Sequence, residues 1–267
     1  MSKTIAIIGG GNLGISIAEG LTAGGFLSPS QITVTRRTTT LLQPLQQKGM
    51  QITSDNLAAA AGSEVILLAV KPFQIKEVIR EIAPALTSDK LLISVVTGVS
   101  MQEMRSEIGI ANSPALFRAM PNTAVAIRES MTCISHSGAS QAQVEWVLEL
   151  FNQVGRVVAI DEKLMDAATV LGACGTAYAM RYIRANIQGG IEIGFDAKTA
   201  SLIAAQTVKG AAELLLQKGT HPEYEIDKVT TPKGCTIAGL NEMEHQGFSS
   251  SLIKGISASY VKIQADK

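Results

Sequence analysis

Three glycines near the N-terminus carry the first chemistry that the sequence indicates. They stand at Gly9, Gly11 and Gly14, in the spacing G-x-G-x-x-G. Between a strand and a helix, the first glycine permits a tight turn, the second lets backbone approach a pyrophosphate, and the third lets the helix pack closely on the strand. The N-terminus of that helix then faces the anion. In this setting the spacing favours a dinucleotide site over an ordinary glycine-rich turn.

The residues around the glycines predict the strand and the helix that such a site needs. Residues 5–9 contain three isoleucines, a composition typical of a strand buried on both faces of a parallel sheet. Leu13, Ile17 and Leu21 recur every four residues, which predicts a helix. The chain therefore passes from strand to helix across the glycines.

The second predicted strand, residues 31–35, ends without an acidic residue. Proteins that prefer NAD place an Asp or Glu there, about 20 residues past the glycines, against the ribose 2′-hydroxyl. Thr35, Arg36, Arg37 and Thr38 occupy the position instead. Two guanidinium groups and two hydroxyls suit a 2′-phosphate, although a solvated basic turn is the alternative. The sequence favours NADP over NAD.

Predicted strands and helices alternate through the first 160 residues. Further strand patterns cover residues 51–53, 64–70, 91–96, 116–120, 133–135 and 157–160, and helical patterns cover 57–62, 74–83 and 140–155. This alternation indicates an α/β fold with a doubly wound parallel sheet, a Rossmann dinucleotide-binding domain. Val70 and Lys71 would lie at the carboxyl edge of the sheet, where ligands bind in such folds.

The second half of the chain changes character. Residues 162–188 form a long helical pattern that is apolar nearly all round and rich in small residues. A helix without a polar face must be buried, and one modest helical domain cannot cover it, so we expect a partner subunit to do so. Further helices are predicted over residues 196–217, 236–245 and 249–264. We expect a Rossmann domain over residues 1–160 and an all-α substrate and dimerisation domain over 161–267.

A turn between two of these helices combines hydroxyls, a proline and a glycine. Residues 229–240 read V-T-T-P-K-G-C-T-I-A-G-L and lead into a helix N-terminus. Such a turn presents several backbone N–H groups to a small carboxylate. From the residue types alone, a plain capping turn is at least as good an interpretation.

Composition excludes several classes of function. The 267 residues include 23 basic and 23 acidic ones, and no basic stripe indicates nucleic acid or a membrane surface as a partner. The apolar runs are too short to span a membrane, and the predicted first strand leaves no room for a signal peptide. Cys133, Cys174 and Cys235 are scattered, as expected in a reducing cytoplasm, and the histidines show no spacing typical of a metal site.

Four segments make the chain resemble pyrroline-5-carboxylate reductases over essentially its whole length. They are the glycine turn, A-V-K-P at 69–72, M-P-N-T at 120–123, and residues 229–240, which are close to the family's V-T-[ST]-P-G-G-T-T-I-A-G-L. The resemblance implies reduction of the cyclic imine 1-pyrroline-5-carboxylate to L-proline by NADPH, with NADH possible. It also implies a cytoplasmic enzyme whose helical domain forms a homodimer, often with five dimers in a decamer.

The resemblance also implies roles for individual residues. Gly9, Gly11, Asn12, Leu13 and Gly14 should hold the pyrophosphate. Thr35, Arg36 and Asn56 should surround the adenosine ribose and its 2′-phosphate. Ala69, Val70, Lys71, Pro72, Val95, Val96 and Thr97 should line the nicotinamide ribose. Thr231, Gly234, Cys235 and Thr236 should bind the substrate carboxylate, with the catalytic Thr236 hydroxyl reaching the ring nitrogen.

The sequence departs from the family pattern in two places. Residues 172–178 read G-A-C-G-T-A-Y where the family has S-G-S-G-P-A-Y, and Lys233 and Cys235 replace a glycine and a small residue. Lys233 either strengthens anion binding or points to solvent. These changes leave the nicotinamide-facing wall and the substrate preference open.

Three other functions are alternatives to this reductase activity. A β-hydroxyacid dehydrogenase shares the architecture but calls for a lysine inside the long helix, whereas Lys163 stands at its start and the next lysine is Lys198. A nucleotide-sensing protein without turnover has no need of the 229–240 turn. A reductase of the six-membered imine stays open, because one methylene is worth only about 1–3 kcal/mol in a pocket.

Overall fold

The computed structural model describes residues 3–109 and 113–265. The chain divides into two compact units, one of residues 1–174 with 262–267 and one of residues 175–261. The boundary expected between residues 160 and 161 stays a prediction.

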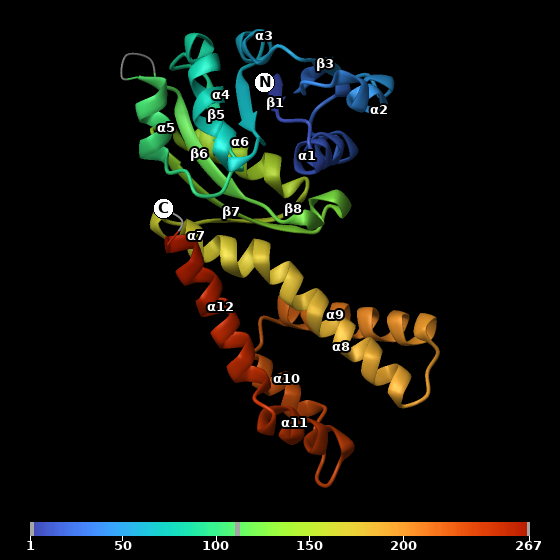
Figure 1. Ribbon diagram of the computed structural model, residues 1–267. Helices are drawn as coiled ribbons and strands as arrows, with labels where there is room; N and C mark the ends of the chain where they lie inside the picture. Colours follow the sequence, from blue (N-terminus) through green and yellow to red (C-terminus); the bar gives the residue numbers. More distant parts are fainter. Residues whose placement is uncertain (1–2, 110–112, 266–267) are drawn as a thin grey trace. The chain divides into compact units, whose positions relative to one another are not determined.

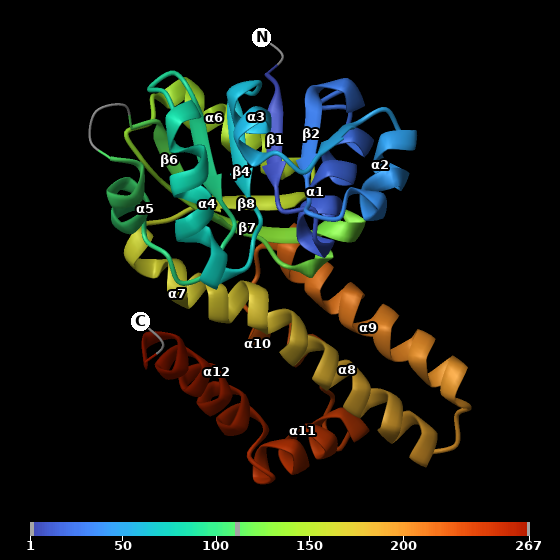
Figure 2. The same ribbon diagram turned by 45° about the horizontal axis from the view of Figure 1, so that its top comes forward.

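The first unit is built on an eight-stranded sheet in the order β3-β2-β1-β4-β5-β6-β7-β8. Figure 2 shows β2, β1, β4 and β6 following one another across this sheet. Its strands are β1 (Ile5–Ile8), β2 (Ile32–Thr35), β3 (Gln51–Thr53), β4 (Val65–Leu68), β5 (Leu91–Ser94), β6 (Ala115–Met120), β7 (Ser130–Ser137) and β8 (Gly155–Ala159). The strands β1 to β6 run parallel, and the chain direction across the sheet reverses beside β1. The expected doubly wound sheet is confirmed.

The last two strands differ from a fully parallel sheet. The strand β7 is antiparallel to β6, and β8 is parallel to β7. The connection from β6 to β7 is residues 121–129, which hold only a short 3-10 helix, Thr123–Ile127. A parallel return needs a crossover of about a dozen residues or more, so this short connection produces an antiparallel pair.

Helices cover both faces of the sheet (Figure 1). One hydrophobic cluster joins the sheet to α1 (Asn12–Ala23), α2 (Gln43–Gln47) and α6 (Gln141–Asn152), and the other joins it to α3 (Asn56–Ala61), α4 (Ile75–Ile82) and α5 (Met101–Ile108). Successive strand residues point to opposite faces, so Ile7 and Leu67 lie in the first cluster and Ile8 and Leu68 in the second. Burial on both faces explains the continuous apolar runs of β1 and β4.

The helical pattern expected over residues 162–188 is not one uninterrupted α-helix. A 3-10 turn (Glu162–Leu164), α7 (Met165–Ala168) and a π-helical segment (Thr169–Cys174) precede α8 (Gly175–Glu192). Inside the segment, the Thr169 hydroxyl donates to the carbonyl oxygen of Met165 over 2.8 Å. Threonine hydroxyls that bond back in this way bend helices, and π-helical turns are frequent at functional sites.

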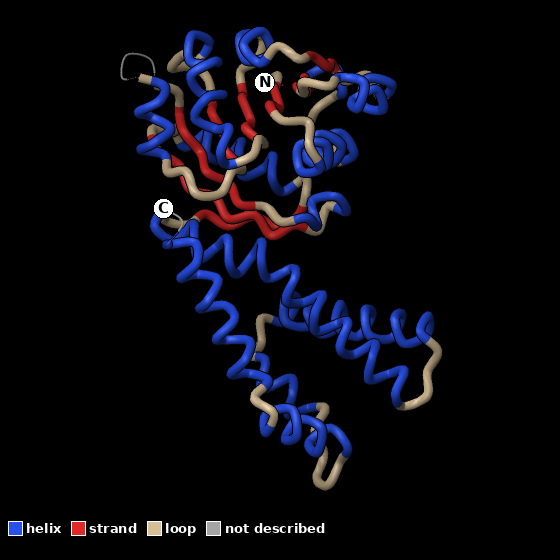
Figure 3. The backbone as a smooth tube through the Cα atoms, in the orientation of Figure 1, coloured by secondary structure: helices blue, strands red, loops and turns tan. Residues whose placement is uncertain are grey.

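The second unit is helical, and within its residues, all of them described, no strand occurs (Figure 3). It holds α8, α9 (Ala197–Lys218), α10 (Pro222–Lys228), α11 (Cys235–His245) and most of α12 (Phe248–Ala265). The expected start of α9 is confirmed, since Asp196 accepts hydrogen bonds from the backbone N–H groups of Lys198 and Thr199. Gly219 ends this helix with a φ of +63°.

Many apolar side chains of the second unit lie open in the single chain. Met180, Leu202 and Ile253 are 62%, 70% and 63% exposed. Large apolar surface of this kind marks an interaction face. Among the helices of residues 3–109 and 113–265, none is long and apolar enough to cross a membrane.

Candidate functional site

The three glycines of the motif differ in whether the surrounding structure leaves room for a side chain. Gly9 has a φ of +112°, and a Cβ there would lie 2.5 Å from the carbonyl oxygen of Ala69. A Cβ on Gly14 would overlap the carbonyl oxygen of Gly9. A Cβ on Gly11 would meet no described atom within 4 Å, and its φ of −87° suits any residue. The protein itself requires Gly9 and Gly14, whereas Gly11 leaves open space beside the turn.

That open space lies at the N-terminus of α1. Gly11 is the N-cap residue and has no side chain to bond the first-turn N–H groups. The backbone N–H of Gly10 donates to the carbonyl oxygen of Thr35 over 2.7 Å, which ties the turn to the end of β2. Free N–H groups and the positive end of a helix dipole together form an anion site. The turn therefore fits a phosphate group.

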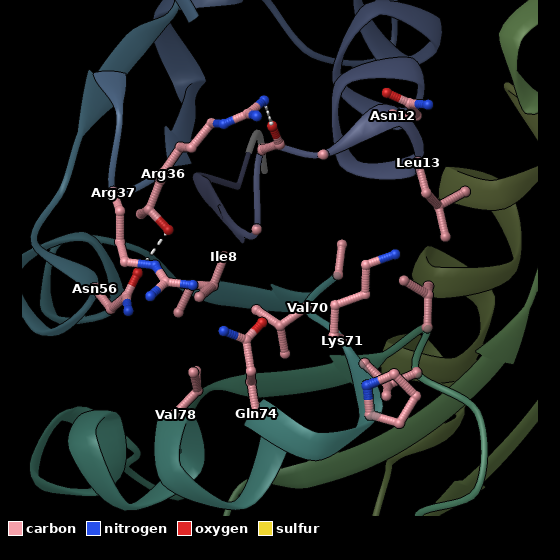
Figure 4. Close-up of a pocket in the computed structure, with 18 of the residues that line it drawn as sticks. Ile8, Asn12, Leu13, Arg36, Arg37, Asn56, Val70, Lys71, Gln74 and Val78 are labelled. Carbon is pink, nitrogen blue, oxygen red and sulfur yellow. Dashed lines mark hydrogen bonds between the residues drawn. The ribbon is translucent and has the colours of Figure 1, made fainter. Parts of the chain in front are cut away.

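A cleft of about 1380 Å³ opens beside this turn, past the carboxyl ends of the parallel strands (Figure 4). Its volume exceeds the range of about 300–1,000 Å³ typical of pockets for small ligands. The predicted cofactor residues that line it are Gly9, Gly11, Asn12, Leu13, Thr35, Arg36, Asn56, Ala69, Val70, Lys71, Pro72, Val95, Val96 and Thr97. Gly14 does not line it but holds α1 against the turn. Their contacts with a cofactor stay predictions.

One end of the cleft is basic. The Arg36 guanidinium donates from Nη1 to the carbonyl oxygen of Gly10 over 2.7 Å, which holds it beside the turn. Arg37 is exposed and lines the same cleft. Figure 4 shows Arg36, Arg37 and Asn56 on one side, with Asn12 and Leu13 on the opposite side. Two guanidinium groups give this end the charge that a phosphate needs.

Two groups of lining residues were missed from the sequence. Thr123, Val125 and Ala126 come from the 3-10 helix after β6, and Gln74, Glu77, Val78 and Glu81 come from α4 and the turn before it. The first group begins with Thr123, the last residue of the M-P-N-T segment, which carries the family resemblance but does not by itself indicate a place in the cleft. Gln74, Val78 and Glu81 share a helix face at spacings of four and three, a signal for one face but not for its surroundings.

The residues expected at the substrate carboxylate lie together in the second unit. The backbone N–H of Gly234 donates to the carbonyl oxygen of Thr231 over 2.9 Å, and a Cβ on Gly234 would lie 2.5 Å from the Thr231 hydroxyl oxygen. Gly234 is the N-cap of α11, which begins at Cys235, and no side chain caps that helix. Thr236 stands half-buried in the first turn. The turn therefore presents uncapped N–H groups.

Lys233 has an unusual backbone conformation in this turn. Its φ is +59°, the left-handed region that favours glycine. Arg128 is the other non-glycine residue with a positive φ among those the structure describes. A residue held there in spite of its side chain is a candidate for a functional role.

The environment of Cys133 does not favour a nucleophilic thiolate. Cys133, Cys174 and Cys235 are free, and burial raises the pKa of the Cys133 thiol. A raised pKa reduces the thiolate fraction that reacts.

Comparisons with known proteins agree along the chain. Residues 162–265 match a family model described as pyrroline-5-carboxylate reductase dimerisation, and residues 4–98 match one described as NADP oxidoreductase, coenzyme F420-dependent. The chain is 45% identical to pyrroline-5-carboxylate reductase 2 of Dictyostelium discoideum over 275 residues, which cover 98% of this chain and 92% of that protein.

Solved structures give the same result. A pyrroline-5-carboxylate reductase from Coxiella burnetii is similar with a TM-score of 0.91 and 30% identity, over 99% of this chain and 98% of the other. A Plasmodium falciparum pyrroline carboxylate reductase with NADP bound is similar with a TM-score of 0.87 and 25% identity, over 98% and 97% of the two chains.

Proposed function

The chain belongs to the pyrroline-5-carboxylate reductase family, and from that membership we propose that it reduces 1-pyrroline-5-carboxylate to L-proline with NADPH. The observation that carries this proposal is the 45% identity to a named reductase over 98% of the chain. A match of that extent includes both the glycine-lined cleft and the turn before α11. The activity is that of an NAD(P)H-dependent oxidoreductase acting on a C=N bond.

The residues of the cleft fit the cofactor. The space beside Gly11 and the uncapped N-terminus of α1 suit a pyrophosphate, and Arg36 and Arg37 suit a 2′-phosphate. The bound nicotinamide supplies the hydride. The protein's task at this site is to bind and orient the nucleotide and to exclude water from the reaction.

The turn before α11 fits the substrate. We assign the carboxylate of the imine to the backbone N–H groups that the 231–236 turn leaves free at the start of α11, since Pro232 has none and that of Gly234 donates to Thr231. We assign the ring nitrogen of the imine to the Thr236 hydroxyl. A substrate that arrives as an iminium has an electrophilic carbon already, so the protein needs no strong acid or base. Thr236 then orients the ring and stabilises the protonated nitrogen. The uncapped helix start at Gly234 supports this assignment.

We further propose that the chain acts as a homodimer through the helical unit, and as a decamer of five dimers. The match of residues 162–265 to a dimerisation family and the exposed apolar side chains of α8, α9 and α12 support the dimer. A cytoplasmic location is proposed as well, supported by three free cysteines.

The test follows the loss of NADPH absorbance in the presence of 1-pyrroline-5-carboxylate, with L-proline identified as the product. Parallel assays replace NADPH by NADH and the five-membered imine by the six-membered one. We expect fast turnover with the five-membered substrate. Faster turnover of the six-membered imine would reassign the substrate, and tight NADPH binding without turnover of either imine would contradict the activity.

A further inference from the structure

A carboxylate reaches the basic end of the cofactor cleft from a helix rather than from the end of β2. Glu81 stands on α4, lines the cleft, and accepts a hydrogen bond at Oε2 from Asn56 Nδ2 over 3.0 Å. Asn56 Oδ1 in turn accepts the hydroxyl proton of Thr35 over 2.6 Å. Three side chains from β2, α3 and α4 thus form one hydrogen-bonded chain.

This chain occupies the groups that would otherwise serve a 2′-phosphate. The Thr35 hydroxyl has a single proton, and that proton is donated to Asn56. One amide N–H of Asn56 is directed to Glu81. The charged donors left to a phosphate at this end are the guanidinium groups of Arg36 and Arg37, and they act in the presence of a negative charge on Glu81.

The carboxylate of Glu81 has a counterpart in NAD-binding folds. There an acidic residue at the end of β2 accepts from the ribose 2′-hydroxyl and repels a 2′-phosphate. In this protein the last residue of β2 is Thr35, and the acidic residue is Glu81 on α4. Asn56 links the two, because it is hydrogen-bonded to both side chains. The two arginines and the glutamate favour opposite nucleotides at the same end of the cleft.

We propose that Glu81 is a specificity-determining residue that weakens binding of the 2′-phosphate and so narrows the preference for NADPH over NADH. This proposal rests on the proposed cofactor function of the cleft. Glu81 is exposed and solvent screens its charge, so we expect an effect of about fivefold rather than a hundredfold.

The experiment measures binding without turnover. Calorimetry on the full-length chain compares adenosine 2′,5′-bisphosphate with AMP, two ligands that differ only in the 2′-phosphate. Glu81→Gln keeps an acceptor oxygen for Asn56 and removes the charge. We expect about fivefold tighter binding of the bisphosphate, AMP affinity within about twofold, and a smaller gain at about 1 M salt.

Glu77→Gln is the matched control. Glu77 lies one turn earlier on α4, lines the same cleft and is exposed. It differs from Glu81 in its contacts, because the described side-chain hydrogen bonds of Asn56 go to Thr35 and Glu81. Its neutralisation should change both affinities in the same proportion. Glu81→Ala is a second variant and should tighten bisphosphate binding at least as much as Glu81→Gln. Melting curves check that each variant is folded.

The outcomes separate two conclusions. An unchanged ratio of the two affinities in both Glu81 variants, or an equal change of that ratio in Glu77→Gln, would overturn the role of Glu81. A native chain that binds neither ligand would overturn the cofactor site itself, and the role of Glu81 with it. If binding is found but 1-pyrroline-5-carboxylate is not turned over, the substrate assignment alone fails.

Discussion

Gly14 lies directly against the carbonyl oxygen of Gly9, so closely that any side chain at residue 14 would overlap that atom. The contact holds the start of α1 against the turn that leaves β1. Gly11, between them in sequence, contacts nothing in the direction of a side chain among the described residues. One short motif therefore combines two glycines that the fold requires with one, Gly11, that the fold itself does not require.

This division predicts different failures for two alanine variants. Gly14→Ala should destabilise the chain by about 1–3 kcal/mol, because its Cβ enters occupied space. Gly11→Ala should cost less than about 1 kcal/mol, since its backbone suits any residue and only the N-cap is changed, but should weaken NADPH binding at least about tenfold. Chemical denaturation and NADPH titration measure both effects. A Gly11→Ala variant that binds NADPH like the native chain would contradict the proposed pyrophosphate site.

Thr236→Ala should lower kcat/KM for 1-pyrroline-5-carboxylate by about tenfold to a hundredfold, the worth of one hydrogen bond to a charged group. The NADPH dissociation constant should stay the same, because Thr236 belongs to the substrate turn. Thr236→Ser keeps the hydroxyl and should recover most of the activity. Unchanged kcat and KM in Thr236→Ala would remove this residue from the mechanism.

Lys233→Gly separates the two interpretations of Lys233. Glycine accepts the φ of +59° without strain, so we expect a stability equal to the native one or greater by at most about 1 kcal/mol. If the ammonium assists carboxylate binding, KM for the imine should rise about threefold while kcat stays constant. We expect this rise. Lys209→Ala, at an exposed site on α9, is the charge control. A KM of Lys233→Gly equal to the native value would mean that Lys233 only points to solvent.

The start of α9 should give the second unit a pH dependence in acid. Hydrogen bonds from Thr199, first from its side chain and then from its backbone, hold the pKa of Asp196 below its ordinary 3.8. A lowered pKa stabilises the fold above the unfolded pKa, and that stability is lost as pH falls through the folded pKa.

Asp196→Ala should therefore lower the melting temperature most above about pH 5, with a difference that shrinks in more acidic solution. Asp196→Asn keeps a capping oxygen without titrating and should resemble the native chain at neutral pH. A difference between the native chain and Asp196→Ala that stays constant down to about pH 2 would contradict the assignment.

The exposed apolar face of the helical unit predicts a loss of dimer on charge insertion. The double change Met180→Glu with Leu202→Glu should convert the protein to monomers, because each charge would be buried unpaired in the interface. Analytical ultracentrifugation measures the assembly state. Leu41→Glu, at a residue 54% exposed in the first unit, is the control and should leave the dimer intact. An intact dimer in the double variant would exclude these two residues from the interface.

Local patterns in the sequence were sufficient for the first part of the site. The isoleucines of β1, the spacing of three glycines and the four-residue repeat of Leu13, Ile17 and Leu21 describe one continuous strand–turn–helix unit. The missing acid after β2 also lies in a continuous stretch. Such features depend on neighbours a few residues apart, and periodicity reports them directly.

The reversed last strands and the segmented helix before α8 were not predicted. Apolar periodicity identifies a strand but not its direction, which here follows from the short connection between β6 and β7. The helical repeat of residues 162–188 likewise conceals a π-helical segment, because one extra residue per turn changes the repeat only slightly.

The doubly wound unit, the helical unit, the glycine turn and the segments that carry the family resemblance could all be predicted from the sequence, because each is encoded in contiguous residues. Which side chains meet at the cleft depends instead on the packing of elements that are distant in sequence. Glu81 reaches Asn56 across 25 residues of chain, and Asn56 reaches Thr35 across 21. Helical spacing gives the face on which Glu81 lies, but the packing of α4 beside α3 on the sheet determines what that face meets.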